Sequence, residues 1–172
     1  MTSTRKICIS GIVIAMYIAV MFVTQSFSFL AIQFRVATTL YSLGYIFPFL
    51  IAPIGFANAL SNLLMGGLGV LDVVGGFLAG VIVSALSYLV RRYKLPTLLI
   101  VPIIMFGNGL IVPIWLSYLL GIPYLMLVVS VSLGQIPSAI AAYILITILD
   151  EYMKKTGGYE YEKERENGSD RS

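Results

Sequence analysis

Histidine is absent from this chain, and cysteine occurs once, as Cys8. A single cysteine excludes an internal disulfide, and the lack of histidine excludes His-based acid–base catalysis and a metal site built from cysteine and histidine. Charge is also scarce, since charged residues make up 11% of the sequence, against about 25% in soluble domains. An intramembrane enzyme would need a nucleophile with its base, a metal cluster or paired carboxylates, and these groups are missing from the apolar part of the chain.

Apolar residues take the place of the missing charge. Between Ile7 and Leu149 the charged residues are Arg35, Asp72, Arg91, Arg92 and Lys94. Long apolar stretches separated by short polar breaks are typical of membrane-spanning helices, which need about 20 residues each. The first stretch, from Ile7 to about residue 23, is longer than the apolar core of a signal peptide. We therefore expect it to be retained as a helix.

The polar breaks predict an all-α integral membrane protein with six transmembrane helices. The expected spans are 6–27, 36–48, 49–66, 70–91, 96–119 and 123–151. Pro48 and Pro53 predict a tight turn between the second and third spans, because proline removes a backbone donor. Residues 1–155 would form one transmembrane domain. Residues 156–172, with glycine and mixed charge, would form a disordered cytoplasmic tail.

The basic residues predict the orientation of these helices. Cytoplasmic loops of membrane proteins carry an excess of lysine and arginine. With both chain ends in the cytoplasm, the inner side would hold Arg5, Lys6, Arg91, Arg92, Lys94, Lys154 and Lys155. Arg35 alone would lie outside.

Arg35 and Asp72 are the candidate charged residues of a binding site. An arginine between Phe34 and Val36 at a membrane boundary must find acceptors or reach water. With Gln33 it could offer several donors to a ligand, or it could anchor the outer interface. Asp72 would lie on the same side, where it could pair with Arg35 or stabilise a helix N-terminus.

Amide side chains provide further candidates. Asn108 and Gln135 each stand about a dozen residues from the start of an expected helix, so they should share a depth. They could hydrogen-bond across helices or face a polar ligand. Asn58 and Asn62 share one face of the third expected helix and allow the same two interpretations. Asn62, nearer the outside, is the better ligand candidate.

Trp115 lies near the outer end of the fifth expected helix. Such a ring commonly lines the bilayer interface, and it could alternatively stack on a planar ligand. On the first expected helix, Gly11, Ala15 and Ala19 repeat every four residues. Stripes of small residues let helices approach closely, so this stripe predicts internal packing or the docking of a partner subunit.

Several of these features together resemble the substrate-binding S components of energy-coupling factor (ECF) transporters. These are small six-helix proteins without a nucleotide site, and they carry an Ala-x-x-x-Ala pattern on the first helix, here Ala15 to Ala19. More specific are Ala31-Ile-Gln-Phe-Arg-Val36, the Asn58 to Asn62 stretch and Gly69-Val-Leu-Asp-Val-Val-Gly-Gly76. These stretches, within a resemblance that covers about residues 5–150, are similar to the QueT family of queuosine-precursor transporters.

The resemblance implies an S-component bundle in the plasma membrane of a prokaryote, which captures a deazaguanine or a similar micronutrient from outside. The implied partners are a membrane coupling subunit (EcfT-like), on which Ala15 and Ala19 would dock, and two ABC ATPases. ATP would be used by those ATPases, so this chain itself would need no cofactor. Neither a metal nor a nucleic acid is implied.

The chain also departs from the family pattern. QueT members often have Ser-Glu after the Gln-Phe-Arg-Val run and a glutamate in the last helix, where this chain has Ala37-Thr38 and Gln135. A cationic amine would then lack carboxylate partners, which favours a neutral precursor, and a different vitamin or aromatic metabolite is an alternative. A non-transport assembly subunit, whose polar residues only hold helices together, is the alternative from another class.

Overall fold

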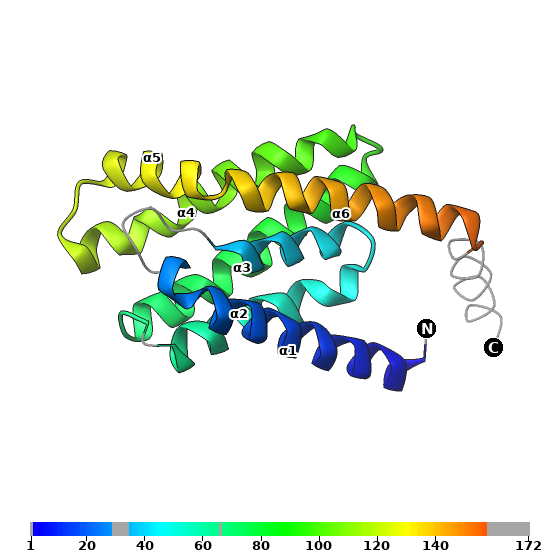
Figure 1. Ribbon diagram of the computed structural model, residues 1–172, viewed down its shortest axis with the longest axis horizontal. Helices are drawn as coiled ribbons and strands as arrows, with labels where there is room; N and C mark the ends of the chain where they lie inside the picture. Colours follow the sequence, from blue (N-terminus) through cyan, green and yellow to red (C-terminus); the bar gives the residue numbers. More distant parts are fainter. Residues whose placement is uncertain (1, 29–34, 66, 158–172) are drawn as a thin grey trace.

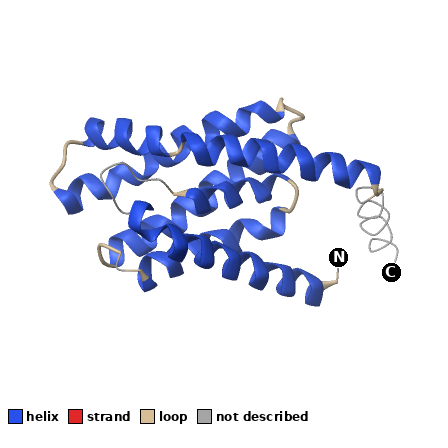
Figure 2. Cartoon of the chain, viewed as in Figure 1, coloured by secondary structure: helices blue, strands red, loops and turns tan. Residues whose placement is uncertain are grey.

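The computed structural model describes residues 2–28, 35–65 and 67–157, which contain helices and no strand (Figure 2). Four helical stretches are long and apolar enough to cross a membrane: Ser3–Thr24 in α1 (Ser3–Ser28), α3 (Val70–Arg92), Thr97–Leu120, which joins η3 (Thr97–Leu99) to α4 (Ile100–Leu120), and α6 (Ile136–Lys155). Two shorter apolar stretches are Pro48–Leu64, which joins η2 (Pro48–Leu50) to α2 (Ile51–Leu64), and α5 (Tyr124–Gly134). The all-α membrane class is therefore confirmed, and the number six stays a prediction.

The second expected helix, 36–48, is wrong in type. Residues Val36–Tyr45 form η1, a 3-10 helix of 10 residues, although such helices rarely exceed about four residues. A 3-10 helix rises about 2.0 Å per residue, against about 1.5 Å in an α-helix. Ten residues therefore extend about 20 Å instead of about 15 Å, which lets this short segment run through the interior beside α1, α3 and α6. Eight of its ten residues are buried.

A close backbone approach explains one glycine of η1. A Cβ atom added to Gly44 would lie 2.5 Å from the Ser84 carbonyl oxygen on α3. Any larger residue at position 44 would push η1 away from α3. The glycine therefore permits the tight contact that buries η1.

The sixth expected helix, 123–151, is also corrected, because it is interrupted at Gln135 between α5 and α6. Pro137, in the first turn of α6, has no backbone N–H to donate into a continuous helix. The Gln135 N–H still bonds to the Val131 carbonyl oxygen at 3.0 Å. The break consequently points the Gln135 side chain into the bundle, where it is 1% exposed.

The bundle has two chemically different ends. The start of α1, the turn after η1, the loop between α3 and η3 and the end of α6 all lie at one end (Figure 1). We call this the basic end, because it carries Arg5, Lys6, Arg91, Arg92, Lys94, Lys154 and Lys155. The loops after α2 and after α4 lie at the opposite end (Figure 1), which we call the polar-site end.

Apolar side chains occupy both the interior and the outer surface. Tyr17, Ile54 and Ile104 are fully buried in the core. On the surface, large apolar side chains such as Ile114 and Ile148 are more than 60% exposed. An exposed apolar surface of this extent is typical of helices that face lipid.

Candidate ligand site

Arg35 occupies the start of η1 and is 5% exposed. Its Nη1 donates to Asn58 Oδ1 at 3.2 Å, and its Nη2 donates to Asn62 Oδ1 at 3.1 Å. The two asparagines lie one turn apart on α2, as their spacing predicts. The Arg35 guanidinium is therefore held by two neutral acceptors inside the bundle, which argues against a role as a surface anchor.

The same asparagines connect Arg35 to α3. Asn58 Nδ2 donates to the Gly76 carbonyl oxygen at 2.7 Å, and Asn62 Nδ2 donates to the Asp72 carbonyl oxygen at 2.9 Å. The oxygen and the nitrogen of each side-chain amide are thus both hydrogen-bonded. Because the Arg35 guanidinium can only donate, the amide atom that faces it must be the oxygen. The structure brings Asn62 into the cluster, where its contacts orient Arg35.

Asp72 is 4% exposed and lies in the first turn of α3. Its Oδ1 accepts a hydrogen bond from Trp115 Nε1 at 2.9 Å, and its Oδ2 accepts one from the Leu68 N–H at 3.3 Å. The contact with Leu68 fits the predicted role at the helix N-terminus. Asp72 is linked to Arg35 indirectly, through Asn62, instead of in the direct pair that the sequence left open.

Trp115 extends from α4 toward α3. A Cβ atom added to Gly75 would lie 2.5 Å from ring atoms of Trp115, so the indole covers this glycine closely. With its N–H on a buried carboxylate, Trp115 faces the bundle instead of the bilayer interface. Tyr118, by contrast, is 81% exposed.

Gln135 and Arg35 belong to one cluster. The Thr38 hydroxyl donates to Gln135 Oε1 at 2.6 Å and lies equally near the Arg35 carbonyl oxygen, at 2.6 Å. The Ser138 hydroxyl also donates to that carbonyl, at 2.9 Å. These contacts join the start of η1 to the break between α5 and α6. They also place the two departures from the family pattern, Thr38 and Gln135, in contact with each other.

Sequence reasoning did not identify Ser138, Tyr17 or Tyr41, and it named Thr38 only as a departure from the family pattern. Thr38 follows Arg35 by one 3-10 turn, a spacing that could have indicated it, whereas Ser138 depends on the helix break. Tyr17 and Tyr41 are fully buried, their rings stack at 6.0 Å between centroids, and their hydroxyls lie 3.2 Å apart. The pair joins α1 to η1 in the buried interior.

Among the described site residues, Asn108 is not joined to the cluster by a hydrogen bond. Asn108 is 2% exposed, and its Nδ2 donates to the Ile104 carbonyl oxygen of its own helix at 2.9 Å. The cross-helix bond to Gln135 that the sequence allowed is not recorded among the described residues. Gln33 lies outside the described residues.

The small-residue stripe Gly11, Ala15 and Ala19 lies on the exposed face of α1. Tyr17 and Met21, on the opposite face, are fully buried. A groove of about 270 Å³ opens beside Ala19. The stripe is therefore not used for packing within the described part of the chain.

The described residues contain no group of three or more His, Cys, Asp or Glu side chains that could hold a metal ion. What the cluster offers instead is a set of hydrogen-bonding groups inside a helical membrane protein. Arginine, amide and indole groups converge near one end, in an arrangement suited to binding a polar molecule.

Comparison with known protein families defines this membrane protein further. The model of the QueT transporter family matches residues 7–151. The chain belongs to this family, which gives it a role in transport. No match to a curated protein or to a solved structure is significant.

Proposed function

We propose that this chain is the substrate-binding (S) subunit of an ECF-type ABC transporter, and that it captures a queuosine precursor, a deazaguanine, for ATP-driven uptake. The observation that carries the proposal is the buried cluster of Arg35, Asn58, Asn62 and Gln135 at the polar-site end. Membership of the QueT transporter family supports the substrate class.

In the proposed topology the chain crosses the plasma membrane of a prokaryote six times. Besides the four long helices, η1 and the joined η2 and α2 would supply crossings, and α5 would complete the last one together with α6. The concentration of lysine and arginine at the basic end supports placing that end, with both termini, in the cytoplasm. The Arg35 cluster would then face the outside.

The contacts of Gln135 suggest how a planar base would be held. The Thr38 hydroxyl has one proton, which cannot serve both Gln135 Oε1 and the Arg35 carbonyl oxygen at once. If the Gln135 amide is rotated, Thr38 donates to the Arg35 carbonyl oxygen and accepts from Gln135 Nε2. Either amide orientation leaves one end of Gln135 to bond the edge of a base. The Arg35 guanidinium would bond a ring carbonyl, and the Trp115 indole would stack on the ring.

The charge of the site favours a neutral precursor. Thr38 and Gln135 form a neutral contact at 2.6 Å, and the Asp72 carboxylate is engaged by Trp115 and Leu68. A cationic amine would find an amide in place of a carboxylate at Gln135 and would lie near the positive charge of Arg35, so we propose that this subunit prefers an uncharged ligand.

The coupling step would use the exposed face of α1. We propose that Ala15 and Ala19 dock on an EcfT-like membrane subunit, which two ABC ATPases drive. The exposure of the stripe supports this proposal. ATP would be used in those partners, and the chain itself would act without a cofactor.

The deciding experiment is to purify the protein without added ligand and to identify any co-purifying small molecule by mass spectrometry. The bound molecule is expected to be a deazaguanine, and Arg35→Ala and Gln135→Ala should each weaken binding about tenfold or more, as loss of a buried hydrogen bond does. Ser87→Ala is the matched control, because Ser87 is buried but bonds only to the Val83 carbonyl of its own helix.

The other outcomes separate the alternatives. If a different vitamin or aromatic metabolite co-purifies with the protein, the transport role stands and the proposed substrate changes. A folded protein that binds no small molecule would favour an assembly subunit. Wild-type binding by both variants would refute the proposed site.

A further inference from the structure

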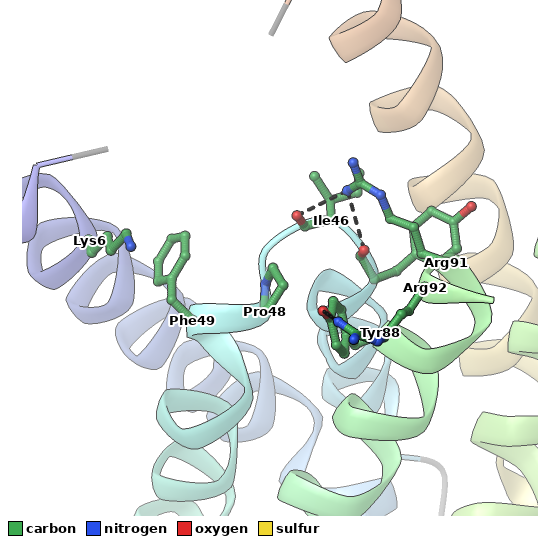
Figure 3. Close-up of a pocket in the computed structure, with 8 residues that line it drawn as sticks. Lys6, Ile46, Pro48, Phe49, Tyr88, Arg91 and Arg92 are labelled. Carbon is green, nitrogen blue, oxygen red and sulfur yellow. Dashed lines mark hydrogen bonds between the residues drawn. The ribbon is translucent and has the colours of Figure 1, made fainter. Parts of the chain in front are cut away.

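A second polar region lies at the basic end, away from the Arg35 cluster. The start of α1, the turn that joins η1 to η2 and the last turns of α3 surround a cavity of about 380 Å³ there. Lys6 and Phe49 stand on one side of it, and Tyr88, Arg91 and Arg92 stand on the other (Figure 3). The volume is within the range of about 300 to 1,000 Å³ that is typical of small-molecule sites.

Arg91 is fixed in the wall of this cavity. Its Nη1 donates to the carbonyl oxygen of Ile46 at 3.1 Å and to that of Tyr45 at 3.4 Å (Figure 3). Its guanidinium also lies 5.9 Å from the centroid of the Tyr45 ring. The two carbonyl oxygens fix the direction of the guanidinium at the edge of the cavity.

Lys6 and Arg92 add two exposed cations. The Lys6 ammonium lies 5.8 Å from the centroid of the Phe49 ring, and Arg92 Nη1 donates to the Tyr88 hydroxyl at 3.2 Å. Neither side chain contacts a carboxylate among the described residues. Three basic side chains from α1 and α3 therefore line one cavity. Basic residues that only orient a protein in the membrane do not need to lie around the same cavity.

The location of the cavity identifies the ligand chemistry. It lies where the spanning stretches of α1 begin and of α3 end, which is the depth of the lipid headgroups. Basic pockets between transmembrane helices at this level suit phosphate-bearing headgroups, and Pro48 and Phe49 add apolar lining to the cavity. We propose that this cavity binds the phosphate group of an anionic lipid, with Lys6, Arg91 and Arg92 as its partners.

The test uses the full chain in nanodiscs that contain equal amounts of phosphatidylglycerol and phosphatidylcholine, with the retained lipids measured by native mass spectrometry. The wild-type protein should retain phosphatidylglycerol preferentially. The Lys6→Gln/Arg92→Gln variant should bind it about 30-fold more weakly, because two basic side chains near the phosphate are removed. The charge-matched control is Lys94→Gln/Lys155→Gln, which changes two exposed lysines of the basic end outside the cavity and should retain the lipid.

Three results would overturn the proposal. They are an equal loss in the two double variants, no preference for phosphatidylglycerol, and displacement of the lipid by glycerol 3-phosphate, which would assign the cavity to a soluble phosphate ester. If the double variant fails to fold, the single Lys6→Gln variant tests the same point, with an expected loss of about fivefold. Because the readout is lipid retention, the result is independent of the proposed uptake function.

Discussion

Arg35 is a buried cation whose guanidinium is held by the oxygens of two asparagine side chains. Burying a charge is costly unless hydrogen bonds replace its water. Asn58 and Asn62 supply these bonds and are themselves fixed by carbonyl oxygens of α3. At the scale of single residues, the polar cluster is thus a set of mutually dependent contacts.

Removing Asn62 should expose this dependence. Asn62→Ala removes the bonds that Asn62 makes to Arg35 Nη2 and to the Asp72 carbonyl oxygen, and should lower the free energy of unfolding by about 1 to 3 kcal/mol. Thermal unfolding in detergent measures the change. Asn108→Ala is the control, because its recorded bond is to its own helix, and it should cost less than about 1 kcal/mol. Equal effects of the two variants would contradict the cluster.

Trp115 is the single tryptophan of the chain, so its fluorescence reports on one position. A valine at Gly75 would overlap the indole, whose ring atoms lie 2.5 Å from an added Cβ. Gly75→Val should therefore separate Trp115 from Asp72 and shift its emission to longer wavelength. Gly11→Ala, where an added Cβ meets nothing within 4 Å, should leave the spectrum unchanged, and an unchanged spectrum in Gly75→Val would refute the contact.

The residues of this cluster differ in how far sequence alone could identify them. Arg35, Asp72 and Gln135 stood out because polar groups are rare in apolar segments. Thr38 and Ser138 gave little signal, since a hydroxyl is common in membrane helices and its partner depends on packing. Asn108 was predicted on the same grounds as Gln135, its depth along a helix, but its side chain bonds within α4. The depth of a residue along a helix therefore does not determine which way its side chain points.

At the scale of elements, the least predictable part is η1. Its apolar composition predicted a membrane segment, but its 3-10 geometry depends on the space between α3 and α6. The break between α5 and α6 had a visible cause in Pro137. Its consequence, a glutamine directed at Thr38, required the fold.

The exposed stripe of α1 leads to a prediction about coupling. Ala15→Trp places a large ring on the face proposed to dock, and should reduce uptake in cells that contain the coupling module by about tenfold or more. Ligand binding by the purified variant should be unchanged, because Ala15 is exposed and lies away from the buried side of α1.

Ile148→Trp is the matched control for this variant. Ile148 is 61% exposed on α6, so the change adds a similar ring to another outward face and should preserve uptake. Loss of ligand binding in Ala15→Trp would show instead that the substitution disturbs the fold.

At the scale of the whole molecule, the charge difference between the two ends predicts the orientation. After Cys8→Ser removes the single cysteine, one cysteine can be placed at Leu68, 45% exposed at the polar-site end, or at Tyr93, 67% exposed at the basic end. On intact cells, a membrane-impermeant maleimide should label Leu68→Cys and spare Tyr93→Cys. Permeabilised cells should label both, and the reverse pattern on intact cells would contradict the proposed topology.

Sequence alone determined the membrane class, the approximate boundaries of α1, α3 and α4, and the separation of basic residues from the Arg35 region. These properties follow from composition along the chain, because a spanning helix satisfies its own backbone and is predominantly apolar. The tertiary structure decided that Arg35 bonds Asn58 and Asn62, that Trp115 turns inward to Asp72, and that Lys6 and Arg91 border one cavity. Each of these contacts joins segments far apart in sequence, and their geometry depends on how the helices pack and where η1 and the break at Gln135 direct the side chains.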